Sequence, residues 1–434
     1  MQPRDITMTK AFFLACLAAS SLCLMLASPV WGAGRQLTAG VNFRQEFDSN
    51  ASRSKENAAS QWTSILEPFA HLRLSTARRS LTLRYAPGLT YNHRLDDLRL
   101  DHRLRAHATL TLTPLLTLQA REAYTKTDDS ATSPEQEAAA LPVALSPDRA
   151  RRRYWQNTFD VDLAWKIARD STLTFGYQHA ILDNRSLDTS DYQRHEPSLS
   201  LSYRWNTQWS GQLDVQHTIG DFDQEDDLVR HAAAGRLFYH LDAHRQIFFD
   251  VSRSVTDYDT GPDYETASFR LGYHAQLSAT TSLTASAGWS VAEQAGGDDR
   301  DGFSYTLDFQ RSLTQKASLL LAGEGGFTGQ EFNGNYDGLS RFRSVAATVR
   351  LALGPRVDAT CGVRLRQDTY FGRQEGKRER AYEGNAGLSW RMTRWYTLGL
   401  QYAYRRLDNS PPTNEYTDHR LLLRISFTRD IWRG

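Results

Sequence analysis

Arginine is the residue best placed to do chemistry in this sequence, because it recurs at alternate positions inside stretches that also carry apolar residues. In the stretch 421–428, for example, Arg424 stands between Leu423 and Ile425. A guanidinium group donates paired hydrogen bonds to carboxylates and phosphates, and a ring of such groups selects anions. The residues that we expect on one shared polar face are Arg44, Arg73, Arg84, Arg105, Arg204, Arg236, Arg270, Asp308, Arg350, Arg364, Arg366, Arg391, Arg405 and Arg424.

The same face also carries carboxylates, among them Glu67, Asp214, Asp250 and Glu324. Two interpretations follow. Either the excess of arginine creates a field that favours anionic solutes, or arginine and carboxylate pair across neighbouring strands and simply line a wall. The order of residues along the chain leaves both open, because it does not specify which residues lie opposite each other.

Other chemistry finds little support in the sequence. The motifs Gly-x-Ser-x-Gly, His-Glu-x-x-His and Cys-x-x-Cys-His and a glycine-rich phosphate loop do not occur. Asp242 and His244 form a lone carboxylate–histidine pair, and the acidic clusters 221–227 and 298–301 are typical of solvated loops. We therefore predict no enzyme, no cofactor and no metal site. The formal net charge of +1 gives no indication of a nucleic-acid partner.

The elements that position the arginines are β-strands. In the segment 280–310, Leu283, Ala285 and Ala287 alternate with serine and threonine, and a second run beginning at Phe303 alternates in the same way. Side chains of a strand point to opposite faces with a period of two, so this segment is a hairpin with one apolar and one polar face. An acidic, glycine-rich linker at 293–302 joins its two strands.

The hairpin pattern recurs and predicts about twenty strands, of which the first spans 37–46 and the last 421–428. Turns of two to five residues alternate with loops of roughly six to twenty-four residues, as in transmembrane barrels of the outer-membrane type. The fold class is therefore all-β, a single antiparallel up-and-down barrel with short periplasmic turns and long extracellular loops. A soluble sandwich or propeller is the alternative, but its strands would be shorter. The alternation slips at Glu122, which lies either above the bilayer or at a bulge.

Tryptophan gathers near the predicted short turns. Such placement is typical of an aromatic girdle at a membrane interface, here the periplasmic one. The girdle residues are Trp165, Trp205, Trp209, Trp390 and Trp395.

The first 33 residues have the pattern of a cleaved signal peptide: a basic start, an apolar run at 11–26 and small residues before position 34. Residues 34–434 are then the barrel. Cys361 is the one cysteine left in this part, so no internal disulfide is expected.

The segments 47–50, 66–74 and 81–85, together with the closing strand at 421–427, resemble putative outer-membrane β-barrel porins of the "β-barrel porin 2" kind. That group includes barrels associated with PEP-CTERM and exopolysaccharide gene clusters. The resemblance implies a porin-like transport protein in the outer membrane of a Gram-negative bacterium, open to anionic solutes or serving exopolysaccharide export. The alternative is a scaffold barrel that encloses a periplasmic partner, such as a cytochrome or a polysaccharide-export protein.

The partners implied are outer-membrane lipid and lipopolysaccharide, the barrel assembly machinery and polysaccharide-export proteins. One departure concerns the assembly machinery, which reads a terminal aromatic residue in most such barrels. This chain ends in Gly434, so Phe427 or Trp432 would have to serve as the signal.

Overall fold

The computed structural model describes residues 34–128, 153–184, 190–296, 299–329, 331–333, 338–371, 376–410 and 415–433. The predicted signal peptide and most of the loop after residue 127 lie outside these ranges. The described residues form twenty β-strands and one 3-10 turn. The strands are β1 (Arg35–Asp48), β2 (Gln61–Ser75), β3 (Arg79–Asn92), β4 (Asp97–Thr113), β5 (Leu116–Thr127), β6 (Tyr154–Ala168), β7 (Ser171–Asn184), β8 (Tyr192–Arg204), β9 (Trp209–Phe222), β10 (Leu228–His240), β11 (Arg245–Tyr258), β12 (Tyr264–Ser278), β13 (Thr281–Gln294), β14 (Arg300–Thr314), β15 (Ala317–Gly329), β16 (Leu339–Gly354), β17 (Val357–Tyr370), β18 (Arg378–Arg391), β19 (Tyr396–Ser410) and β20 (Tyr416–Arg433).

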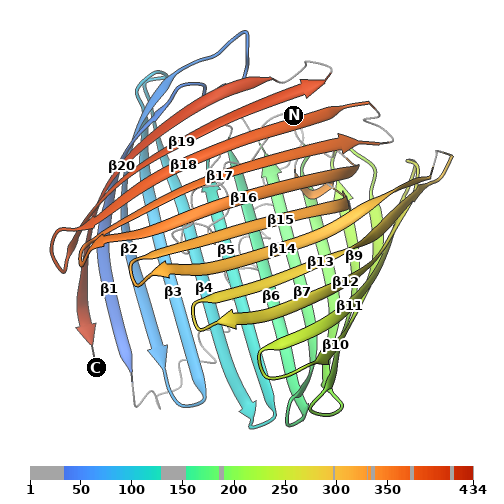
Figure 1. The fold of residues 1–434 in the computed structure, drawn as a ribbon. Coiled ribbons are helices and arrows are strands. Elements are labelled where there is room, and N and C mark those ends of the chain that lie inside the picture. Colours follow the sequence, from blue (N-terminus) through green and yellow to red (C-terminus); the bar gives the residue numbers. More distant parts are fainter. Residues whose placement is uncertain are drawn as a thin grey trace.

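Each strand pairs antiparallel with its neighbours in sequence, and β1 pairs with β20, so the sheet closes into a barrel (Figure 1). The predicted fold class and strand number are therefore confirmed. Closure removes the sheet edge and gives every strand a hydrogen-bonding partner on both sides, which a bilayer demands because it offers no water to bare backbone groups. Among the described residues, no helix is long and apolar enough to cross a membrane.

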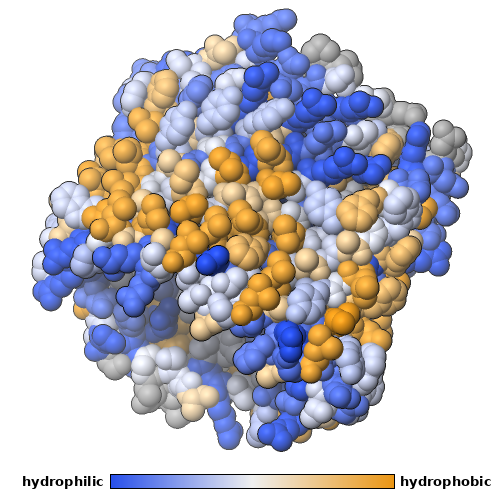
Figure 2. All heavy atoms as spheres, viewed as in Figure 1, coloured by the Kyte–Doolittle hydropathy of each residue, from blue (hydrophilic) through white to orange (hydrophobic). Residues whose placement is uncertain are grey.

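The register places apolar side chains on the outer face. Phe43 lies opposite Leu66 on one side and Ile425 on the other, and these side chains are exposed by 40%, 43% and 43%. Figure 2 shows hydrophobic side chains gathered across the middle of the visible face, with hydrophilic ones toward its ends. This exposed apolar belt suits lipid and would be costly in water.

The first and last strands are longer than predicted, at both ends. The first spans Arg35–Asp48 rather than 37–46, and the last spans Tyr416–Arg433 rather than 421–428. Periplasmic turns such as 114–115 and 241–244 have the predicted shortness, whereas the outer connection 93–96 is shorter than the predicted loops.

The suggestion of a bulge at Glu122 is wrong. Glu122 pairs in register with Ala106 and Phe159, and the shift in the β4–β5 register lies instead between Thr111 and Thr113. Glu122 therefore stays on the outer face, in the extracellular half of β5, where the prediction that it lies above the bilayer still stands.

Candidate channel lumen

The inner face is the side opposite the apolar belt, and cross-strand register places all the predicted arginines and Asp308 on it. Arg84 lies opposite Arg105, Arg424 lies opposite Arg44, and Asp308 lies between Thr284 and Ala322. An arginine on the lipid side at mid-membrane would cost about 2–4 kcal/mol, which explains why the alternation holds so strictly. That these side chains line an open pore stays a prediction.

In the extracellular half of the barrel, inner-face arginines are paired and buried. Glu67 accepts a hydrogen bond from Arg103 and lies 3.7 Å from Arg44. Arg405 lies 3.5 Å from Glu383 and is only 1% exposed. The alternative interpretation, pairing across strands, describes this half.

A second pairing runs between β1 and β20, where the chain closes on itself. Arg420 donates a hydrogen bond to Glu46, and both side chains are buried. These residues are far apart in the sequence but adjacent in the wall. An ion pair as well as backbone hydrogen bonds therefore joins the first strand to the last.

At mid-height, one carboxylate serves two arginines. Arg236 donates to both oxygens of Asp250, and Arg270 approaches the same group at 3.5 Å. On β17, Arg366 donates two hydrogen bonds to Asp368, at 2.7 and 2.8 Å. Arg364 donates a hydrogen bond to Ser344 at 3.2 Å and makes a longer contact with Glu324, at 3.5 Å between half-exposed side chains.

The periplasmic half is different. Among the described residues, no carboxylate lies within 4.0 Å of Arg73, Arg84 or Arg350; Arg84 instead stacks over the ring of Phe69 at 4.6 Å. Arg204 donates to two turn carbonyls, those of Asn206 and Thr207. The Arg391–Asp358 pair, at 3.7 Å, is exposed and therefore weak.

A cavity of about 630 Å³ opens at this periplasmic end, against β14–β20. Its charged lining consists of Lys316, Arg350, Arg424 and a single carboxylate, Asp358. Cationic groups thus outnumber anionic ones in the lining of this cavity.

A 3-10 turn that follows β15 lies on the inner face, which sequence analysis did not predict. This turn, η1 (Glu331–Asn333), reaches across to β10–β12, where Glu331 accepts hydrogen bonds from Arg230 (2.6 Å), Tyr264 (2.6 Å) and Tyr258 (2.9 Å). Burial alone would raise the pKa of Glu331, but Arg230 and the two phenol donors outweigh it, so the pKa is lowered.

The neighbouring Phe332 anchors the same turn. Its ring packs against Tyr192 and Phe222, at 5.2 and 5.3 Å between centroids, and the guanidinium of Arg194 lies 5.1 Å from it. Together Glu331 and Phe332 fix the η1 turn over the inner face of β8–β12 near the extracellular mouth, which narrows the entrance.

Sequence reasoning missed Arg103, Arg230 and Arg420 as inner-face residues. The closing strand was predicted to start one residue after Arg420, and Arg230 lies near the start of β10, where apolar alternation fades. Continuing the same period of two past the last apolar residue would have found Arg103 and Arg420.

The five predicted girdle tryptophans lie beside the short turns 169–170, 205–208, 355–356 and 392–395, and all are exposed. Trp395 contacts the guanidinium of Arg394 at 4.3 Å. Their role as a girdle at the bilayer boundary stays a prediction.

Comparison with known proteins supports the architecture. No protein-family model and no curated protein sequence matches the chain. The siderophore receptor PirA of Pseudomonas aeruginosa is similar in structure, with a TM-score of 0.53 at 9% identity, covering 91% of this chain and 80% of that one. OccK2 of the same organism, solved with glucuronate, has a TM-score of 0.46 at 12% identity, over 92% of this chain and 98% of that one.

Sequence identities this low indicate a shared fold and nothing about function. The closed antiparallel sheet, its apolar outer belt and its short and long connections define a transmembrane barrel of the bacterial outer membrane. The resemblance to the "β-barrel porin 2" kind remains an expectation within that class.

Proposed function

We propose that the barrel is an outer-membrane channel for small anionic solutes. The observation that carries the proposal is the set of inner-face arginines in the periplasmic half, Arg73, Arg84 and Arg350, that have no carboxylate partner among the described residues. Paired arginines contribute little net field, whereas unpaired ones in a confined, low-dielectric channel raise the local concentration of anions.

The arrangement suits carboxylate-bearing solutes in particular. The inward turn at Glu331 narrows the mouth, and the cavity at the periplasmic end presents three cationic side chains against one carboxylate. A carboxylate that passes the mouth would meet guanidinium groups in the geometry that binds it bidentately.

The test is a planar-bilayer recording of the reversal potential in a salt gradient. We expect the wild-type channel to prefer anions and the triple variant R73Q/R84Q/R350Q to lose that preference by roughly tenfold in permeability ratio, since fixed charge sets the local counter-ion concentration. The matched control R73K/R84K/R350K keeps the charge and should keep the preference. Cation preference in the wild-type channel, or identical behaviour of both triples, would overturn the proposal.

A finer form of the proposal, taken from the family resemblance, is that the anionic solute is an exopolysaccharide. Uronic-acid carboxylates would suit the same arginines. Block of the ionic current by an acidic polysaccharide, with no block by a neutral one of equal length, is the expected result. The scaffold alternative predicts instead a stoichiometric partner on co-purification, which the inward η1 turn would hinder.

We also propose that the outer-membrane barrel assembly machinery recognises this chain. A barrel of this class is inserted by the outer-membrane assembly machinery, and Phe427 and Trp432 are the aromatic residues near the chain end on β20. Loss of membrane insertion on changing one of them to alanine would identify the signal.

A further inference from the structure

The wall of the barrel has a seam between β14 and β15. The ladder that joins these strands runs from Thr314 and Ala317 only as far as Tyr305 and Gly325. Beyond that point, β14 continues to Arg300 on the side of β13, and β15 continues to Gly329 on the side of β16. Toward the extracellular end the two strands therefore part, and each keeps only one neighbour (Figure 1).

The parted strand ends overlap rather than leaving a clean gap. Leu339, Phe327 and Phe371, from the β15–β17 side, pack with Tyr264 and Ala292, from the β12–β13 side. A methyl group added at Gly302 of β14 would lie 2.5 Å from the guanidinium of Arg341, which belongs to β16. The guanidinium of Arg341 thus reaches across the seam to the space beside Gly302 of β14.

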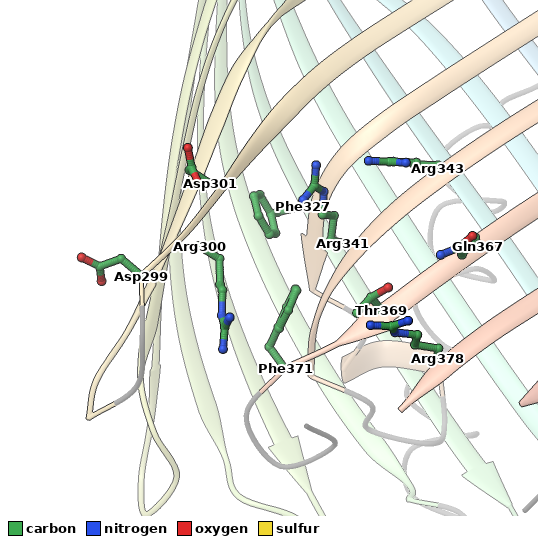
Figure 3. A pocket seen from close by; sticks show the side chains of 10 residues that line it. All are labelled: Asp299, Arg300, Asp301, Phe327, Arg341, Arg343, Gln367, Thr369, Phe371 and Arg378. Atoms are coloured by element: carbon green, nitrogen blue, oxygen red, sulfur yellow. The ribbon is translucent and has the colours of Figure 1, made fainter. Parts of the chain in front are cut away.

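A cavity of about 530 Å³ lies in this seam (Figure 3). Its lining contains four arginines, Arg300, Arg341, Arg343 and Arg378, against the two carboxylates Asp299 and Asp301. Asp301 already accepts a hydrogen bond from the indole of Trp289, at 3.1 Å. The lining is therefore cationic, and Phe327 and Phe371 add two rings to it.

The register extends this cationic patch over the outer face of β16–β18. Arg341, Thr369 and Arg378 lie in one row across three strands, and Arg343, Gln367 and Arg380 lie in the next. One step closer to the middle of the same face are Val345 and Leu365, which are exposed by 57% and 53%. The arginine rows thus stand directly above the apolar belt, at the level where lipid head groups begin.

The charge of these arginines is not balanced by a carboxylate in the part of the chain that the structure describes. Among the described residues, no carboxylate lies within 4.0 Å of Arg341, Arg343, Arg378 or Arg380; Asp408, opposite Arg380, is held by Arg406 at 2.8 Å. Elsewhere on the outer face the extracellular arginines are neutralised, as Arg253 is by Glu265. A group of uncompensated arginines at a lipid boundary indicates an anionic ligand rather than a structural ion pair.

We propose that the β14–β15 seam and the arginine rows beside it bind the phosphorylated head group of an outer-leaflet glycolipid of the lipopolysaccharide type. Arg343 and Arg378 hold a phosphate at the surface, and Arg341 receives a second anionic group inside the seam. The apolar belt below contacts the acyl chains. A volume of about 530 Å³ suits a sugar phosphate rather than a whole lipid.

The experiment uses the full-length barrel in detergent micelles and measures lipid binding by native mass spectrometry. The probes are lipid A with two phosphates, with one, and with none. We expect the affinity to rise with each phosphate. The variant R343Q/R378Q should bind the diphosphorylated lipid about tenfold more weakly, because it loses charge-assisted hydrogen bonds.

The matched control is R245Q/R253Q, which removes the same charge from the same outer face but from β11 residues that are already paired and lie away from β16–β18. It should change the affinity by less than about twofold, as expected for exposed pairs. Equal losses in both double variants, or equal binding of the lipid without phosphates, would overturn the proposal.

Inorganic phosphate distinguishes the two sources of the ligand. If the seam binds the lipid, millimolar phosphate should leave the bound lipid in place; if phosphate displaces it fully, the site is a plain phosphate site and the lipid assignment is wrong. The single variant R378Q, on an exposed residue, should lower the affinity about threefold and serves if the double variant fails to fold. Ion selectivity of the channel should be the same in all these variants, since none changes the inner face.

Discussion

Two stretches of the barrel wall share the same alternation but differ in what they present to the lumen. On β12–β14 the inner positions are mostly small hydroxyl residues, such as Ser268, Ser286 and Thr306. On β17–β20 and β1 they are buried arginines and carboxylates, such as Arg405, Arg420 and Glu46. Both stretches keep an apolar outer face.

The difference lies in how each stretch satisfies its polar groups. Ser252 bonds to Ser268 at 2.8 Å and Ser286 to Thr306 at 2.7 Å, so these hydroxyl groups are satisfied by neutral neighbours, and the bonds add no charge to the inner face. The charged stretch is satisfied by ion pairs, and any imbalance there becomes a field across the lumen. Alternation alone therefore specifies a barrel. The residues at the polar positions specify its ion selectivity and the sites where a substitution most lowers its stability.

The largest effect is expected from breaking the buried pair between β1 and β20. Arg420→Leu leaves Glu46 as a buried charge without its main partner, which should cost about 3–5 kcal/mol of the free energy of unfolding. Denaturant unfolding in micelles measures it. The double variant E46L/R420L should recover most of the loss; no recovery would mean that the pair itself is unimportant.

A second effect is expected at the inward turn of the lumen. Glu331→Gln removes the charge that holds the turn to Arg230, so the turn should loosen and single-channel conductance should rise. Phe332→Leu is the milder control, since it keeps an apolar anchor against Tyr192.

The same carboxylate predicts a pH dependence. The pKa of Glu331 is lower in the folded protein than its unfolded value of about 4.3. The ionised carboxylate therefore stabilises the η1 turn fully above the unfolded pKa, and this stabilisation is lost only as pH falls through the lower, folded pKa. Wild-type conductance should stay constant from neutral pH to about pH 4.3 and rise only below it. The glutamine variant should show no such transition; an equal transition in both would assign it to another group.

A smaller change is expected at Asp308, a carboxylate on the inner face of the hydroxyl stretch. Asp308→Asn removes an anionic group from the inner face and should raise the anion-to-cation permeability ratio by about twofold, in the direction opposite to the arginine variants. Reversal potentials measure it, and Thr306→Val at the neighbouring inner position should leave the ratio unchanged.

The smallest effect concerns stability on the hydroxyl stretch. Ser286→Ala breaks one neutral hydrogen bond, with Thr306, and should cost about 0.5–1.5 kcal/mol. Denaturant unfolding in micelles measures this loss too. If Ser286→Ala lowered the free energy of unfolding as much as Arg420→Leu, the hydroxyl and charged stretches would not differ in how they stabilise the barrel.

Much of the fold could be predicted because a membrane barrel repeats one local rule. The alternation around Leu283 and Trp289, and around each later strand, requires only neighbours in sequence, and β13 does pair with β12 and β14. The positions of Arg44, Arg236 and Arg405 on the inner face follow from that rule too. Their partners do not, because Glu67, Asp250 and Glu383 come from other strands whose register depends on turn geometry and on barrel shear.

The sequence by itself determined the class of architecture, the strand number and the face of each side chain, since these follow from a period of two and from the cost of placing charge in lipid. Only the tertiary structure decided which arginines are neutralised, that Glu331 folds inward onto β10–β12, and that β14 parts from β15. Each of these joins residues far apart in the chain, as Arg420 joins Glu46. Such contacts depend on closure of the whole barrel, which no local pattern encodes.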